Sequence, residues 1–299
     1  REGESLRGIG DTFGGLSTDV VTANFIDFDL DGDLDVAAAP LSPSSTIEVP
    51  SGFNPEGVWM FEQVEGDGGA PRFELVTESL DLDPRLDCAA NDAAAPSTAL
   101  RYSGGGFVVA DLDLDGDEDL FVPRPSNQCA HGPLWYENQA SEGRVGFSTR
   151  PIAAGAFLQS SRSAVAGDLD RDGDPDLVVH NSGSGRIGVF ENVINERRGR
   201  SPRWLRVRAQ TRGRSAEALA LTLYLDEPDV ASRRVRRRAF GGGTLQPGSG
   251  LPEVVFGLGD HAGPVWVETV FADGSHASAR VEAGTTELLL LDCEAERCP

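Results

Sequence analysis

Short runs of β-branched, apolar or small residues recur along the chain and predict strands rather than helices. Runs of this kind stand before aspartate-rich segments: VVTANFI (20–26), GGFVVA (105–110) and SAVAG (163–167). Others follow the same segments: VAAAP (36–40), LFVPRP (120–125) and LVVHN (177–181). Because none of these runs has the period of an amphipathic helix, we interpret the unit as strand, acidic loop, strand.

Further strand-like runs extend each unit. They are GVWMFEQ (57–63) and RFELVTE (72–78), PLWYENQ (133–139) and VGFSTR (145–150), and RIGVFEN (186–192). The acidic segments begin at Asp27, Asp111 and Asp168, so the spacing is 84 and then 57 residues, and the longer interval contains an insertion over 80–102. A period of this length with about four strands per unit indicates the blades of a propeller.

The last third of the chain has a different pattern and charge. Alternation in WLRVRAQ (204–210) and VWVETV (265–270) predicts strands with one buried face, in a small β domain. Residues 1–196 hold 11 arginines and 35 acidic residues, whereas residues 197–299 hold 15 arginines and 13 acidic residues. We therefore predict four parts: a lead segment (1–15), a repeat region (16–196), a β domain (197–292) and a tail (293–299).

Each acidic segment reads D-x-D-x-D-G-x-x-D, which is the chemistry of a calcium loop. Ca²⁺ takes six to eight oxygen ligands, and carboxylates at positions 1, 3 and 5 converge in a tight loop that glycine at position 6 permits. Position 7 would add a backbone carbonyl and position 9 a closing bidentate carboxylate. The strand-like flanks exclude an EF-hand, and Mg²⁺ prefers fewer carboxylates. Three Ca²⁺ ions are expected, one in each segment, and solvated acidic turns are the alternative. The predicted ligands are Asp27, Asp29, Asp31, Asp33 and Asp35; Asp111, Asp113, Asp115, Asp117 and Asp119; and Asp168, Asp170, Asp172, Asp174 and Asp176.

The chain has four cysteines, and none has the CxxC spacing of a zinc or redox site. Disulfides pairing Cys88 with Cys129 and Cys293 with Cys298 are expected, because each pair lies within one predicted part. Such bonds persist in oxidising compartments. Four unpaired buried thiols are the alternative.

The repeated unit resembles the FG-GAP or VCBS-type repeat of integrin α-subunit propellers and of many secreted bacterial proteins, over roughly residues 16–196. The resemblance implies Ca²⁺ loops on one rim of a β-propeller, although such propellers usually have seven blades and only three repeats are recognisable here. The following domain resembles the ASPIC and UnbV domain of the cartilage acidic protein family. That resemblance rests on Trp204, Leu205, Val207, Phe256, Gly257, Leu258, Gly259, Asp273 and Gly274, with FADG in place of the usual Trp-Pro-Asp-Gly-like turn. An all-β fold follows: three propeller-like blades and a small β-sandwich-like domain.

No catalytic constellation stands out, so we expect a binding protein rather than an enzyme. There is no G-x-S-x-G, H-E-x-x-H or P-loop, and the histidines are scattered singly at His131, His180, His261 and His276. Asp260 beside His261 falls in the glycine turn of the C-terminal resemblance. The expected function is an extracellular, calcium-binding adhesion or surface-assembly module of bacterial type, with a glycan or a surface protein as ligand. A secreted hydrolase or lyase on the same scaffold is the alternative.

Charge and topology also predict partners. The arginine-rich stretch 197–238 holds 13 arginines and 4 acidic residues. It is interpreted as a solvated strand face or as a surface that docks on acidic repeats; nucleic acid is disfavoured because no stacking aromatics interleave with the arginines. No apolar run reaches the roughly 18 residues of a membrane span. Since three blades cannot close a ring, open strand edges favour a homo-oligomer or extracellular filament. The acidic first part and the arginine-rich last part of the chain favour head-to-tail contacts between copies.

Overall fold

The structure is a computed structural model that describes residues 20–40, 58–66, 69, 71–82, 106–123, 133–152, 161–181, 186–194, 203–210, 218–226, 235–239, 253–271 and 273–291. These residues form strands joined by loops and short 3-10 turns, among them η2 (Thr77–Leu80) and η3 (Ala140–Glu142). This agrees with the predicted all-β fold. Within the same residues, no helix has the length and apolar character that a membrane span requires.

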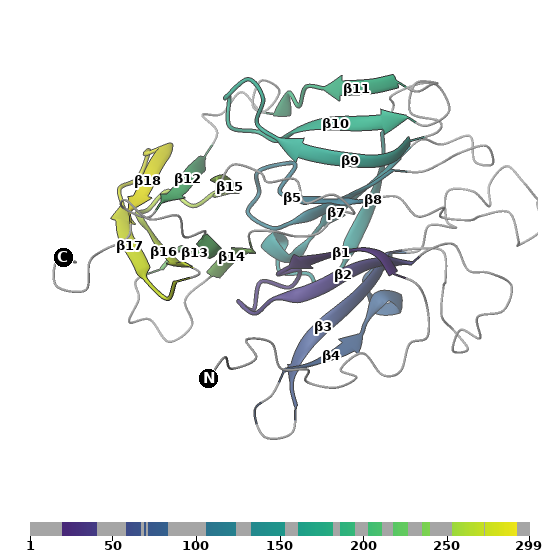
Figure 1. Cartoon of the computed structure of the whole chain (residues 1–299), viewed down its shortest axis with the longest axis horizontal. Helices are drawn as coiled ribbons and strands as arrows, with labels where there is room; N and C mark the ends of the chain where they lie inside the picture. The colour runs from purple at the N-terminus through teal and green to yellow at the C-terminus, as the bar shows by residue number, and fades with distance from the viewer. Residues whose placement is uncertain are drawn as a thin grey trace, which may run out of the picture.

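Three antiparallel sheets correspond to the three sequence repeats (Figure 1). Repeat 1 has the order β1-β2-β3-β4, repeat 2 has β5-β6-β7-β8, and repeat 3 has β11-β10-β9. Their bounds are β1 (Val20–Ile26), β2 (Asp35–Pro40), β3 (Trp59–Glu65), β4 (Pro71–Leu75), β5 (Val108–Ala110), β6 (Asp119–Val122), β7 (Leu134–Asn138), β8 (Phe147–Pro151), β9 (Ser161–Gly167), β10 (Asp176–Asn181) and β11 (Arg186–Phe190).

The sheets pack face to face, with repeat 2 in the middle. Side chains alternate between the two faces of a strand, so Leu120 and Val122 of β6 enter a core shared with repeat 1, whereas Phe121 enters a core shared with repeat 3. All three side chains are buried. In the described part of the chain the three sheets do not close into a ring, so the propeller and its blade count stay predictions.

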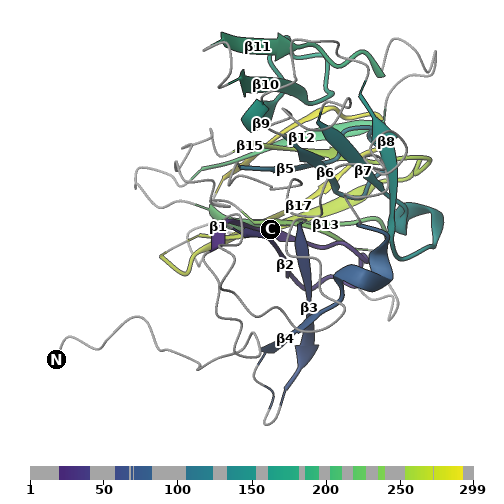
Figure 2. The ribbon, with the colours of Figure 1, turned by 90° about the vertical axis from the view of Figure 1, so that its right-hand side faces the viewer.

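The C-terminal domain is a pair of sheets around a single core, as the β-sandwich-like prediction expects (Figure 2). One sheet has the order β15-β12-β18, with β12 parallel to β18, and the other has β14-β13-β16-β17. The bounds are β12 (Trp204–Gln210), β13 (Ala218–Tyr224), β14 (Val235–Ala239), β15 (Glu253–Gly257), β16 (Val265–Phe271), β17 (His276–Val281) and β18 (Glu287–Leu291).

Candidate metal sites on the repeat loops

The three acidic loops share one backbone conformation. We call them loop 1 (27–35), loop 2 (111–119) and loop 3 (168–176); each joins the first two strands of its repeat. The glycine at position 6 has a positive φ of 94° to 103° in all three: Gly32, Gly116 and Gly173. Position 4 is also left-handed, although it holds non-glycine residues: Leu30 (φ 62°), Leu114 (φ 60°) and Arg171 (φ 70°). Because L side chains disfavour this region, the surrounding hydrogen bonds must hold the loop in shape.

The aspartate at position 9 supplies the most regular of these hydrogen bonds. Its Oδ2 accepts the N–H of position 2: Phe28 to Asp35 at 3.3 Å, Leu112 to Asp119 at 3.0 Å and Leu169 to Asp176 at 2.8 Å. Its Oδ1 accepts an N–H from the third strand or from just beyond it, at 2.8 Å in each repeat: Gln63, Asn138 and Asn192. Position 9 is thus a structural anchor. Since a carboxylate oxygen has more than one acceptor site, these bonds leave each oxygen able to contact an ion as well.

Hydrogen bonds from inside the loop orient the remaining carboxylates. The glycine N–H at position 6 donates to position 1, at 3.4 Å for Asp27 and 3.1 Å for Asp111 and Asp168. The N–H at position 7, in Asp33, Asp117 and Asp174, donates to position 5 at distances of 2.9 to 3.2 Å. In each loop, backbone N–H groups and carboxylates therefore point toward the centre of the loop.

The structure brings a triad of predicted ligands together in each loop, with oxygen atoms within 4.8 Å of one another: Asp27, Asp29 and Asp35; Asp111, Asp113 and Asp115; and Asp168, Asp170 and Asp176. These acidic clusters could hold a metal ion. The other predicted ligands, Asp31, Asp33, Asp117, Asp119, Asp172 and Asp174, lie in the same loops but outside these triads.

Two buried oxygens show that the donor set fits a cation. Oδ2 of Asp27 and Oδ1 of Asp168 are buried without a hydrogen-bond partner. Both residues hold position 1, which is the first predicted ligand. A buried carboxylate oxygen without a donor is costly unless a cation or proton balances it, so an ion at positions 1, 3 and 9 would satisfy these atoms.

Burial also changes the acidity of the loops. Burial, and secondly the charge of Glu118, raises the pKa of Asp27 to about 8. Burial raises the pKa of Asp35 to about 8, and burial followed by the charge of Asp115 raises that of Asp117 to about 7. Asp119 is fully buried, and its pKa is raised well above the ordinary value by burial and by Asp113. Without a cation these carboxyls would hold protons near neutral pH, whereas a bound cation would keep them ionised.

An asparagine of the next repeat binds loop 1 and another binds loop 2, a role that the sequence interpretation missed. Nδ2 of Asn138 donates to the carbonyl of Phe28 in loop 1 at 2.9 Å and to that of Glu118 at 3.2 Å. Nδ2 of Asn192 donates in the same way to Leu112 of loop 2 at 2.8 Å and to Pro175 at 3.3 Å. The recurring Glu-Asn in LWYEN and GVFEN was the available signal.

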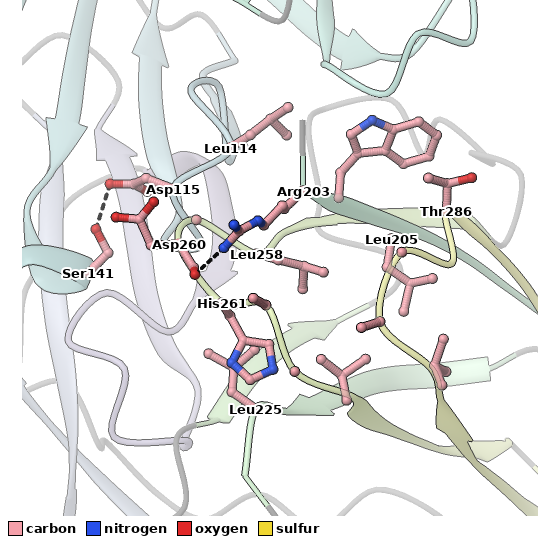
Figure 3. Close-up of a pocket in the computed structure, with 18 of the residues that line it drawn as sticks. Leu114, Asp115, Ser141, Arg203, Leu205, Leu225, Leu258, Asp260, His261 and Thr286 are labelled. Atoms are coloured by element: carbon pink, nitrogen blue, oxygen red, sulfur yellow. Dashed lines mark hydrogen bonds between the residues drawn. The ribbon is translucent and has the colours of Figure 1, made fainter. Parts of the chain in front are cut away.

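A cleft of about 1360 Å³ lies between loop 2 and the C-terminal domain (Figure 3). Its loop side includes Asp115, whose Oδ2 accepts the hydroxyl of Ser141 at 2.5 Å. On the opposite side, Arg203 donates to the carbonyl of Asp260, and the His261 ring lies 3.1 Å from the carbonyl of Pro264. The Asp260–His261 neighbours of the sequence thus lie in a turn of the C-terminal domain whose hydrogen bonds run to Arg203 and Pro264.

The cysteine predictions lie outside the described residues: Cys88, Cys129, Cys293 and Cys298. The same is true of His131 and of the side chains of the arginine run at 233–238. The two disulfides therefore stay predictions.

Comparison with known families agrees with part of the resemblance. A family model described as an FG-GAP-like repeat matches residues 111–179, from the first aspartate of loop 2 into β10. A search of curated proteins found no match. An FG-GAP-like repeat is therefore present at these residues, while the ASPIC and UnbV-like assignment of the C-terminal domain stays a prediction.

Proposed function

We propose that the chain is an extracellular, calcium-binding adhesion or surface-assembly module in which ions rigidify the three repeat loops. The observation that carries the proposal is the threefold recurrence of one loop geometry with converging carboxylates, together with the buried position 1 oxygens of loops 1 and 3. The FG-GAP-like repeat is consistent with an extracellular adhesion or surface module. A binding role is favoured over a catalytic one, because carboxylates that hold an ion stay ionised and cannot act as general acids.

The donor set favours Ca²⁺ over other ions. Each loop offers carboxylate oxygens and neither histidine nor cysteine, which disfavours zinc and later transition metals. Mg²⁺ demands an octahedral shell that keeps several waters, whereas Ca²⁺ accepts many carboxylates in a flexible shell. In loops 1 and 3, an ion bound to positions 1, 3 and 9 would tie the start of the loop to the second strand of the repeat.

Thermal unfolding tests the calcium proposal. Binding to the native state alone raises stability by RT ln(1 + [L]/Kd), so millimolar Ca²⁺ should raise Tm above its value in chelator, and equimolar Mg²⁺ should raise it much less. Identical unfolding curves in Ca²⁺ and in chelator would refute the proposal.

Assembly rests on a separate feature, the outer face of repeat 3. We define it by four exposed apolar side chains: Val165 (53% exposed), Leu169 (57%), Ile187 (69%) and Val189 (65%). The matching side chains Val108 and Leu112 of repeat 2 are 6% exposed, because repeat 3 packs on them. We propose that a second copy of the chain covers the outer face of repeat 3, in the way that repeat 3 covers Val108 and Leu112 of repeat 2.

The two outermost faces of the repeat region suggest a symmetric pairing. On the far side of repeat 1, Trp59 and Phe61 are buried, but Phe25 (50% exposed) and Leu75 (37%) of the same face are exposed. The four apolar side chains of the outer face of repeat 3 are all more exposed than these two, so repeat 3 would meet repeat 3 of the second copy around a twofold axis. This differs from the head-to-tail contact that the charge asymmetry predicted.

Light scattering after size exclusion tests the assembly. The wild type should be a dimer at micromolar concentration, and Ile187→Asp with Val189→Asp should give a monomer that binds the same number of Ca²⁺ ions. A wild type that stays monomeric across a wide concentration range would contradict this proposal and leave the calcium proposal standing.

A further inference from the structure

The C-terminal domain lies directly on loops 2 and 3, through the position 1 aspartate of each. At loop 2, the N–H of Gly257 donates to Oδ2 of Asp111 at 3.0 Å, and a Cβ on Gly257 would lie only 2.1 Å from that oxygen. Beside it, the N–H of Gly259 donates to the carbonyl of Leu114 at 3.2 Å. Leu114 is the left-handed residue at position 4, so the contact depends on the folded shape of the loop.

At loop 3 the contact is a buried ion pair. The guanidinium of Arg206 pairs with Oδ2 of Asp168, and the two side chains are 3% and 2% exposed. Arg206 also donates to Glu287 of β18 at 3.0 Å, and its guanidinium carbon lies 5.2 Å from the centre of the Trp204 ring. Trp204 covers Gly173 so closely that a Cβ there would lie 1.9 Å from the ring.

The two oxygens of Asp168 have different surroundings. Oδ2 accepts the Arg206 guanidinium and the Gly173 N–H, whereas Oδ1 is buried without a hydrogen-bond partner. Asp168 therefore has one oxygen for the C-terminal domain and one for an ion held with Asp170 and Asp176. This is the usual arrangement of a metal ligand whose second atom is fixed by an outer partner.

We propose that ion binding at loop 3 and docking of the C-terminal domain stabilise each other through Asp168, with Arg206 as the positioning residue. This inference rests on the proposed calcium binding. Five carboxylates repel one another in loop 3, and an ion that gathers them holds the shape on which Trp204 and Arg206 pack. By reciprocity, docking must raise the affinity of loop 3 for the ion by the same factor.

Loop 1 provides a matched control, because its position 1 aspartate is contacted from repeat 2. The N–H of Asp27 donates to Glu118 at 3.2 Å, and Asn138 binds the carbonyl of Phe28. Position 3 is alike in both loops: Asp29 accepts the N–H of Asp31 at 3.3 Å, and Asp170 accepts that of Asp172 at 3.2 Å. An asparagine at either position keeps this acceptor and removes one ligand charge.

The experiment compares Asp170→Asn with Asp29→Asn in the full chain. Calorimetry counts bound Ca²⁺, and the emission of Trp204, which is 8% exposed and covers Gly173 of loop 3, reports docking in a background where Trp59, Trp135 and Trp266 are replaced by phenylalanine. In the wild type, chelator should shift emission to the red and Ca²⁺ should reverse the shift. Both variants should lose one ion, but only Asp170→Asn should need about tenfold more Ca²⁺ for the blue-shifted emission.

Replacing the positioning residue gives the reciprocal measurement. Arg206→Leu should weaken Ca²⁺ binding at one site by about the same tenfold, and Arg206→Lys should restore part of it, because an ammonium keeps the charge without the planar fork. Tighter binding in Arg206→Leu would mean that the guanidinium only repels the ion, and would overturn the inference.

The outcomes separate this inference from the proposed function. If three ions bind but Trp204 emission does not change with Ca²⁺, or if both asparagine variants give the same emission curves, the proposed coupling between loop 3 and the C-terminal domain is wrong and calcium binding stands. If the wild type binds no Ca²⁺, both are wrong.

Discussion

Loops 1 and 2 differ from loop 3 in what lies over them. The side chain at position 2 is 1% exposed in loop 1 (Phe28) and 6% in loop 2 (Leu112), but 57% exposed in loop 3 (Leu169). Yet the left-handed residue at position 4 and both hydrogen bonds of the position 9 aspartate are the same in all three loops. The shape of the loop is therefore set by its own sequence and its own repeat, and the next element along the chain sets only its environment.

The largest effect should come from the anchor at position 9. Asp119→Ala leaves the buried N–H groups of Leu112 and Asn138 without acceptors, and at about 1–3 kcal/mol for each unsatisfied group the free energy of unfolding should fall by about 4 kcal/mol. Asp119→Asn keeps one oxygen and should lose about half as much. Urea unfolding measures both, and an equal loss in the two variants would show that the oxygens act through packing alone.

Position 2 should distinguish a covered loop from an open one. Leu112→Ala removes a side chain packed between repeats 2 and 3 and should cost about 3 kcal/mol. Leu169→Ala at the exposed equivalent should change the free energy of unfolding by less than about 0.5 kcal/mol. Similar losses from both changes, measured on dilute samples, would mean that Leu169 is covered in solution.

The two asparagine clamps should differ in strength. Asn138 is 1% exposed and Asn192 is half-buried, although each donates to two carbonyls. Asn138→Ala should therefore cost about 2 kcal/mol and Asn192→Ala about 1 kcal/mol. Denaturant midpoints at constant m-value would show which variant loses more free energy of unfolding. A larger loss for Asn192→Ala would reverse our ranking of the two repeat interfaces.

The last difference is between the metal-free and the calcium-bound protein, in how stability depends on pH. The pKa values of Asp27 and Asp35 are about 8 when folded, against an ordinary 3.8, so between these values the metal-free native state holds protons that the unfolded chain has lost. Its stability should fall as the pH rises from about 4 to 8, so Tm should be lower at pH 8 than at pH 5. In saturating Ca²⁺ this fall should disappear, because the ion keeps both carboxylates ionised. A metal-free Tm that rises with pH would contradict the assigned protonation.

The sequence allowed the strands and the acidic loops between them to be predicted well, because both follow local rules. The run VVTANFI coincides with β1, and the converging carboxylates at positions 1 and 3 follow from their spacing. The left-handed residue at position 4 could not be predicted, since leucine and arginine carry no such signal. The expected bidentate role of position 9 stays a prediction; the spacing did not predict that its oxygens also accept backbone N–H groups from the loop and from the third strand or just beyond it.

Long-range contacts were harder to infer. Arg206 is one of 13 arginines in the stretch 197–238, and nothing local distinguishes it from its exposed neighbour Arg208 on the same strand. Docking of this stretch on the acidic repeats was one of the predicted alternatives, and at Arg206 the contact occurs within the same chain. Likewise, the sequence singled out Gly257 only through the family resemblance. Its contact with Asp111 could not be predicted, because it depends on tertiary packing.

The stoichiometry of calcium binding tests the central claim most directly. Isothermal titration of chelator-treated protein should give three ions per chain, with dissociation constants of about 10⁻⁶ to 10⁻³ M. Asparagine substitution of the position 3 aspartate should remove these ions one loop at a time, in Asp29→Asn, Asp113→Asn and Asp170→Asn. A wild-type stoichiometry near zero or one would contradict the account, because each of the three loops brings together a triad of carboxylates that could hold an ion.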